Sequence, residues 1–200
     1  MSSSVILIND DGTVNLLIGS ADIGQGSETV LSQIAAEGLG IDLKDITVTA
    51  SDTQFTPYDT GTFASSQTYV AGNAIFLAAK DAREKIIKGL AKFYNTQEQY
   101  VAFEDGSFII KLSNGCTKLT LKEAISKITF GGKGVIITGS SSYKAEEAPP
   151  PFAVCWAKAA VDIKTGSIHL KHIIEAVDVG KAINPELVEG QVQGGISMGV

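Results

Sequence analysis

The sequence predicts an α+β fold built as two lobes of mixed β-sheet with packed helices. Three observations support this class. Short β-branched runs alternate with longer segments whose apolar residues recur every three to four positions. Several of the short runs occur as pairs around tight turns. A strand–strand–helix–strand–helix order in residues 1–95 is followed by a variation on the same order in residues 96–200, so a lobe boundary is expected near residue 95.

The first lobe is predicted to begin with a hairpin at residues 5–18, because two apolar runs flank an Asp-Gly turn. Apolar spacing then predicts a helix at residues 28–39 that ends at a glycine. An alternating β-branched run predicts a strand at 46–50. Residues 52–65, rich in Thr, Pro, Gly and Ser, predict a loop, and a long helix follows from about Ser66 to Tyr94.

The second lobe repeats these signals with shorter elements. They predict a hairpin at 101–110, a short helix at 121–128 and a strand at 135–138. A polar connection at 140–151 leads to a hairpin at 152–177, and Pro185 suits the first turn of a final helix.

Composition excludes two classes of partner. A net charge of −6 provides no basic field for a phosphate backbone, so no nucleic-acid partner is expected. No apolar run approaches the roughly 20 residues that a membrane helix needs, so no membrane partner is expected. Residues 1–4 lack the charged and apolar regions of a signal peptide, which predicts a cytoplasmic protein.

The metal-ligating residue types are sparse and badly placed for a metal site. Cys116 and Cys155 lie far apart, in no metal-ligand spacing. His169 and His172 are three positions apart in a predicted strand, which should place them on opposite faces. The cysteines are therefore interpreted as reduced thiols and the histidines as ordinary strand residues.

Two loops that lead into predicted helices are the best candidates for chemistry. Residues 19–27 (GSADIGQGS) and 61–68 (GTFASSQT) each place free backbone N–H groups at the positive end of a helix, which favours anions. Gln25 adds a donor and an acceptor. Simple N-capping by Ser65 or Ser66 is the alternative for the second loop. Glycines in the segment 190–195 indicate either close packing or ligand approach.

At these residues the sequence resembles the C-terminal part of the large, molybdopterin-binding subunit of the molybdenum hydroxylases, such as xanthine dehydrogenase and aldehyde oxidoreductase. The resemblance covers nearly the whole chain. Its most specific motifs are Gly19-Ser-Ala-Asp-Ile-Gly-Gln-Gly-Ser, Val161-Asp-Ile-Lys-Thr-Gly and Asp178-Val-Gly-Lys-Ala-Ile-Asn-Pro, followed by Gly190-Gln.

The resemblance implies a molybdopterin site, with the cofactor in its mononucleotide or cytosine-dinucleotide form. The metal is then held by the cofactor's own sulfurs, and the family's catalytic glutamate is expected beyond residue 200, so neither metal ligand nor catalytic residue is assigned here. Many relatives carry arginine where Gln67 stands. The residues implied to bind the cofactor are Gln25, Gly26, Phe63, Ala64, Ser65, Ser66, Gln67 and Gln191.

Two hypotheses of function follow from the resemblance. In the first, the chain is a fragment of a xanthine dehydrogenase-like enzyme that hydroxylates a heterocycle or an aldehyde with oxygen from water. It would then act with the remainder of the molybdenum subunit and with iron–sulfur and FAD-carrying partners, and be inactive alone. In the second, it is a non-catalytic binding or assembly subunit that partner chains complete.

Overall fold

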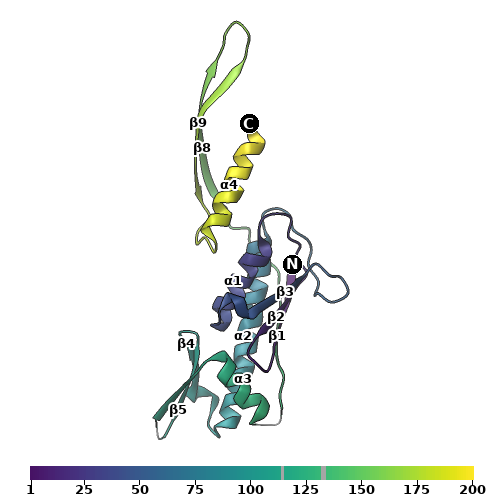
Figure 1. Cartoon of the computed structure of the whole chain (residues 1–200), viewed down its shortest axis with the longest axis vertical. Helices are drawn as coiled ribbons and strands as arrows, with labels where there is room; N and C mark the ends of the chain where they lie inside the picture. The colour runs from purple at the N-terminus through teal and green to yellow at the C-terminus, as the bar shows by residue number, and fades with distance from the viewer. Residues whose placement is uncertain (114, 132–133) are drawn as a thin grey trace. The chain divides into compact units, whose positions relative to one another are not determined.

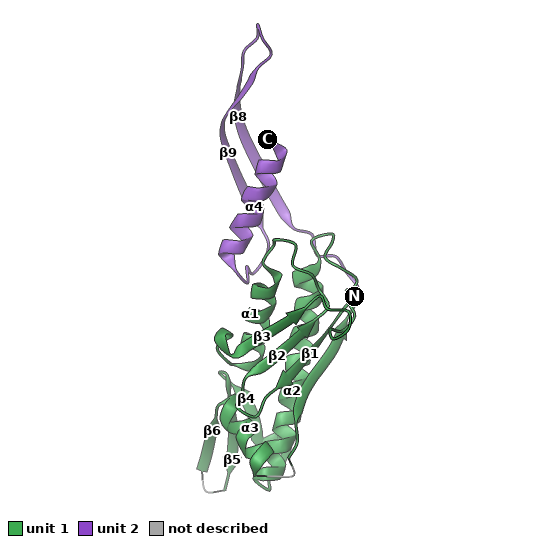
Figure 2. Cartoon of the chain, turned by 45° about the vertical axis from the view of Figure 1, so that its right-hand side comes forward, with its two compact units in different colours: residues 1–145 green, residues 146–200 purple. Residues whose placement is uncertain are grey.

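The structure, a computed structural model, describes residues 1–113, 115–131 and 134–200 and separates into two units (Figure 2). The units are Met1–Ala145 and Glu146–Val200, whereas the sequence predicted a boundary near residue 95. Residue 95 instead lies inside the first unit, because Leu90 before it and Phe108 after it belong to the same buried core.

The main sheet of the first unit has the strand order β3-β2-β1-β7. The predicted hairpin is confirmed: β1 (Ser2–Ile8) and β2 (Val14–Ile18) are antiparallel. The predicted strand β3 (Ile46–Ala50) runs parallel to β2, because a helix carries the chain back across the sheet between them. β7 (Ile137–Tyr143) closes the other side, antiparallel to β1.

Two helices cover one face of this sheet, α1 (Ser27–Leu39) and α2 (Gln67–Phe93), as Figure 1 shows. Alternate residues of β1 and β2 are buried, which is the pattern of strands with one face on a core. β7 approaches α2 so closely that a Cβ on Gly139 would lie 2.1 Å from the carbonyl oxygen of Ala78. Only glycine fits there.

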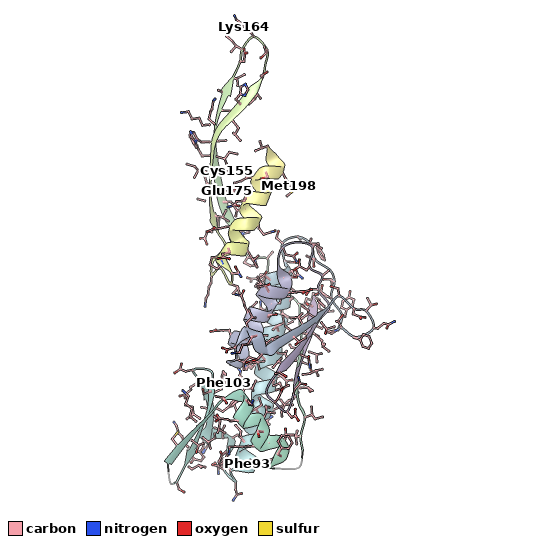
Figure 3. The ribbon with its side chains drawn as sticks, in the orientation of Figure 1. Phe93, Phe103, Cys155, Lys164, Glu175 and Met198 are labelled. Atoms are coloured by element: carbon pink, nitrogen blue, oxygen red, sulfur yellow. The ribbon has the colours of Figure 1, made fainter. Side chains whose placement is uncertain are left out.

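The rest of the first unit packs around the second half of α2. Strands β4 (Val101–Glu104), β5 (Ser107–Leu112) and β6 (Gly115–Leu119) form an antiparallel meander, and α3 (Leu121–Phe130) follows. The predicted hairpin and helix are confirmed, and α3 begins with a capping box between Thr120 and Glu123. Phe103, labelled in Figure 3, lies under the guanidinium of Arg83 at 4.8 Å. Short 3-10 turns, Leu43–Asp45 and Glu98–Tyr100, precede β3 and β4.

Two strand predictions for this unit were incomplete. β6 was not predicted, because its sequence GCTKL carries little apolar alternation. β7 was predicted at 135–138, with a polar connection from residue 140, but it extends through three serines to Tyr143. Backbone pairing with β1 explains the extension, since Ser140, Ser141 and Ser142 align with residues 3–5 of that strand.

The second unit consists of a hairpin and a helix, both as predicted. β8 (Phe152–Val161) pairs with β9 (Ile168–Asp178), and the carboxylate of Asp162 holds the connecting turn by accepting from the N–H of Lys164 at 2.8 Å. Lys164 marks this turn in Figure 3. α4 (Pro185–Gly199) is capped by Asn184, whose side chain accepts from the N–H of Leu187 at 3.1 Å. No residue of Glu146–Val200 is buried.

A β-bulge in β9 overturns the expectation that the two histidines lie on opposite faces. His172 pairs with Lys158 and His169 pairs with Ala160, so Lys171 is the extra residue of the bulge. Lys158 and Ala160 are two positions apart on β8 and share a face, so their partner histidines share it as well.

Among the described residues, no helix is both long and apolar enough to cross a membrane.

Candidate functional site

The two predicted loops lie side by side because they leave the sheet at the same edge. β2 and β3 are parallel, and Ile18 pairs with Ala50 at their carboxyl ends. The next residues tie the loops together: Ser51 donates its N–H to the carbonyl of Ile18 and its hydroxyl to the carbonyl of Ser20, both at 3.1 Å. Ligands of open sheets bind at such carboxyl edges of parallel strands.

The loop after β3 then runs beside the first residues of β1. Ser3 donates its N–H to the carbonyl of Tyr58 at 3.0 Å, and Thr60 donates to the carbonyl of Met1 at 3.2 Å. The turn that follows is held by Asp59, whose carboxylate accepts from the N–H of Gly61 at 2.7 Å. These bonds direct residues 61–67 toward the loop that precedes α1.

Gln25 and Gln67, both predicted as site residues, meet at the carbonyl oxygen of Ala21. Each donates its side-chain amide to this oxygen at 3.3 Å, and the hydroxyl of Thr62 donates to it at 2.6 Å. Gln25 also donates to the side-chain oxygen of Gln67, and its own oxygen accepts from the N–H of Ile23 at 2.7 Å. The glutamine pair therefore links the two loops.

The start of α1 holds a carboxylate of the chain itself. Gly26, the N-cap residue, has a φ of 76° and no side chain, so it cannot cap the helix. Asp22 replaces it: its carboxylate accepts from the N–H of Gly24 at 2.8 Å and of Glu28 at 3.5 Å. The Gly24 hydrogen bond is the main cause that lowers the pKa of Asp22, helped by the N–H groups of Glu28, Gly26 and Ser27.

The start of α2 holds no such group. Ser66 donates its hydroxyl back to the carbonyl of Phe63 at 2.9 Å, and no side chain of the described residues caps the helix. The capping interpretation of Ser65 and Ser66 is therefore wrong. Ala64 and Ser65 have φ values of 52° and 54°, which is left-handed backbone in two consecutive non-glycine residues. The first-turn N–H groups of α2 have no partner inside the helix.

Two buried hydroxyls flank the loop before α1. The side chains of Ser20 and Ser27 are buried, and their Oγ atoms have no hydrogen-bond partner among the described atoms. The hydroxyls of Ser2 and Ser4 in β1 are buried and unpaired in the same way, so this feature does not distinguish the loop before α1.

The other predicted residues are placed as follows. Phe63, Ala64 and Ser65 are exposed at the start of α2, and Gly26 is half-buried. Gln191 belongs to the second unit, where it is exposed on α4. A Cβ on Gly190, Gly194 or Gly195 would meet no described atom within 4 Å, so packing inside the unit does not explain these glycines.

Sequence reasoning did not single out Asp22 or Thr62. The spacing Asp22-Ile-Gly24 is nevertheless the pattern of a turn in which Asp binds the N–H two residues ahead. The described residues contain no group of three or more His, Cys, Asp or Glu that could hold a metal. The site is thus an array of N–H, amide and hydroxyl groups suited to a polar, anionic organic ligand.

Comparison with known proteins identifies related molybdenum-binding subunits. The chain is 35% identical over 197 residues to the xanthine dehydrogenase molybdenum-binding subunit of Escherichia coli O157:H7, covering 98% of the chain and 26% of that subunit. It is 30% identical over 200 residues to the carbon monoxide dehydrogenase large chain of Hydrogenophaga pseudoflava, covering 98% of the chain and 25% of that relative.

A solved Cu,Mo-CO dehydrogenase, in the carbon monoxide reduced state, matches the structure with a TM-score of 0.89 at 29% identity, over 98% of this chain and 25% of that one. The chain thus spans about a quarter of the length of these relatives. The family model of the molybdopterin cofactor-binding domain matches residues 1–200, and the chain belongs to that family.

Proposed function

We propose that the chain forms one side of the molybdopterin pocket in a xanthine dehydrogenase-like molybdenum hydroxylase. The start of α2 would hold the anionic phosphate end of the cofactor, and the linked pair Gln25 and Gln67 would lie beside its pterin. The observation that carries this proposal is the left-handed backbone at Ala64 and Ser65, immediately before an uncapped helix start.

This backbone conformation is costly, and a ligand site would explain it. A left-handed non-glycine residue costs roughly 1–2 kcal/mol, and such residues collect at ligand sites. Consecutive N–H groups in turn-like backbone form a concave anion site, and the N-terminus of a helix adds its dipole to it. The segment from Phe63 to Gln67 leads into such a helix start, and within it the N–H of Ser66 is already used by the carbonyl of Phe63 at 3.2 Å.

The residues present fit molybdopterin. Hydroxyl and backbone donors around the two loops suit phosphate and pterin oxygens. Gln67 is neutral, so phosphate binding here would rely on N–H groups rather than on a charged side chain. The start of α1 is not expected to be a second phosphate site, because Asp22 already occupies it.

We further propose that the whole protein hydroxylates a heterocycle or an aldehyde. The support comes from similarity to a xanthine dehydrogenase molybdenum-binding subunit and to PaoC, an aldehyde oxidoreductase molybdenum-binding subunit, both of Escherichia coli. When bound, the cofactor supplies the molybdenum at which oxygen from water is transferred. Electrons would then pass to iron–sulfur and flavin partners, and the remainder of the molybdenum subunit would complete the pocket.

An added carboxylate at the start of α2 tests the proposed cofactor site. In a complete molybdenum-binding subunit that carries this sequence, Thr68→Asp places a negative charge on the exposed first turn of α2. Helix stability should rise by about 0.5 kcal/mol because the charge favours the helix dipole. Molybdenum content, measured by elemental analysis, should fall at least tenfold because the carboxylate repels phosphate.

The matched control is Thr29→Asp, in the first turn of α1, which should leave molybdenum content within twofold of the parent. Full molybdenum content in Thr68→Asp would overturn the proposal. An equal loss in both variants would overturn it too, because the effect would not depend on which helix start is charged.

A further inference from the structure

α4 covers part of one face of the hairpin in the second unit, whose far end with Val161, Ile168 and Leu170 stays exposed, and nothing in the unit covers the other face. Along β9, Ile173, Glu175 and Val177 alternate as half-buried residues, and α4 has a half-buried series that includes Val192 and Ile196. Both views show α4 beside the hairpin (Figures 1 and 2). We call the sheet face that bears Ile173 the covered face. Cys155 and Glu175, labelled in Figure 3, pair across it.

The opposite face, here called the open face, is apolar and exposed. Register places on it the pairs Val154 with Ala176 and Trp156 with Ile174, with Phe152 at its end. The exposed fractions are 66% for Phe152, 72% for Val154, 53% for Trp156 and 64% for Ile174. Four large apolar side chains in one row on a sheet are typical of an interface rather than of a solvated surface.

The β-bulge gives the open face a polar end. Lys158 and His172 pair directly after the row, and the bulge brings His169 onto the same face. Without the bulge, His169 would point to the covered face. The open face thus consists of an apolar row followed by a cationic ammonium and two imidazoles, all of which are partners for carboxylates.

We propose that the open face docks onto the part of the molybdenum-binding subunit that lies outside the matched quarter, at an apolar layer bordered by Asp or Glu residues that face Lys158. The proposal rests on the proposed function, because it takes its partner from the same subunit. A two-stranded hairpin is marginal in water unless more strands or a packed layer support it. The relatives are about four times longer than this chain, so the subunit has the material for that layer.

Chemical footprinting tests whether the face is covered. Trp156 is the only tryptophan of the chain. Its rate of hydroxyl-radical oxidation should be at least tenfold lower in the complete, cofactor-free subunit than in the 200-residue chain. In the complete subunit, Val154→Lys should restore oxidation of Trp156. Ile163→Lys, the same kind of change at a 94% exposed turn residue, should not. Equal oxidation of Trp156 in the complete subunit and in the chain would overturn the proposal.

Zero-length carbodiimide coupling identifies the occupant. Lys158 should be joined by an amide bond to an Asp or Glu outside the matched quarter of the same polypeptide, with loss of one water. Lys158→Arg should abolish the coupling and leave the slow oxidation of Trp156 in the complete subunit unchanged. Coupling to a second copy, detected by mixing isotopically distinct subunits, or to an iron–sulfur or flavin subunit would overturn the proposal. The oxidation of Trp156 and the coupling of Lys158 are both measured on cofactor-free subunit. Failure of the Thr68→Asp test would therefore contradict the proposed cofactor site without contradicting the proposed docking of the open face.

Discussion

The two helix starts of the first unit look alike in sequence and differ in structure. Each follows a strand of the same sheet edge and a loop of small residues. α1 begins behind Asp22, whose carboxylate binds the N–H groups of the loop and of the first turn. α2 begins behind Ala64 and Ser65, whose left-handed backbone leaves the helix start uncapped by any side chain of the described residues.

The difference teaches that a glycine- or serine-rich loop before a helix does not by itself define an anion site. What decides is whether a nearby side chain already satisfies the N–H groups. At α1 an internal anion does so, and the loop contributes its glutamine instead. At α2 the serine that stands at the cap position bonds backward to Phe63 and leaves the helix open. Four substitutions test this contrast in the chain itself.

The largest effect is expected from cutting the link between the two helix starts. Gln67→Met keeps the length of a buried side chain but removes its bonds to Ala21 and Gln25. The polar groups that lose their hydrogen-bond partners should lower the free energy of unfolding by about 2 kcal/mol. For a chain of this size the melting temperature should then fall by about 4–8 °C. Gln54→Met, in the exposed loop, is the control and should change the melting temperature little. An equal fall for Gln54→Met would show that the effect of Gln67→Met does not come from its bonds to Ala21 and Gln25.

A smaller effect is expected from exchanging backbone preferences between the two starts. Gly26→Ala forces a side chain into left-handed backbone at α1 and should cost about 1 kcal/mol in the free energy of unfolding. Ala64→Gly relieves the same conformation at α2 and should be neutral or slightly stabilising, since the more flexible unfolded chain offsets part of the relief. Denaturant titration compares the two. If both lowered stability equally, the strain inferred at Ala64 would be absent.

The smallest effect is expected from Asp22→Asn, and it should depend on pH. Hydrogen bonding lowers the pKa of Asp22 in the folded chain below its ordinary value of 3.8. A carboxyl with a depressed folded pKa contributes stability above its unfolded pKa and loses it as the pH falls through the folded value.

The melting temperature of Asp22→Asn should therefore lie below that of the parent at neutral pH, by an amount equivalent to about 0.5 kcal/mol for a carboxylate at a helix N-terminus. The difference should vanish in acid below the folded pKa. Asp10→Asn makes the same change of charge in the turn after β1 and serves as the control. A difference that persisted unchanged into acid would mean that Asp22 does not bind as a carboxylate.

Local patterns predicted most elements and pointed to the two candidate loops, because hairpin turns, helix periodicity and resemblance motifs all act over short stretches of chain. The meeting of Gln25 and Gln67 was not predictable from spacing alone, since it depends on β2 and β3 being parallel and in register. The extent of β7 depended on a distant partner strand rather than on its own serines. The two histidines of β9 were misplaced because one bulged residue reverses the alternation of a strand.

The pairing of β1 with β7 also affects how the protein is made. Ser3 and Ser142, which bond across this pair, are 139 positions apart. At about 5–20 residues per second, a ribosome would need roughly 7–30 seconds to deliver the second strand after the first. During that interval β1 has β2 on one side and a row of unpaired backbone groups on the other, which is the usual template for intermolecular strand pairing. The newly made chain is therefore most exposed to aggregation before β7 is complete, and a chaperone that shields this edge should raise the yield of folded protein.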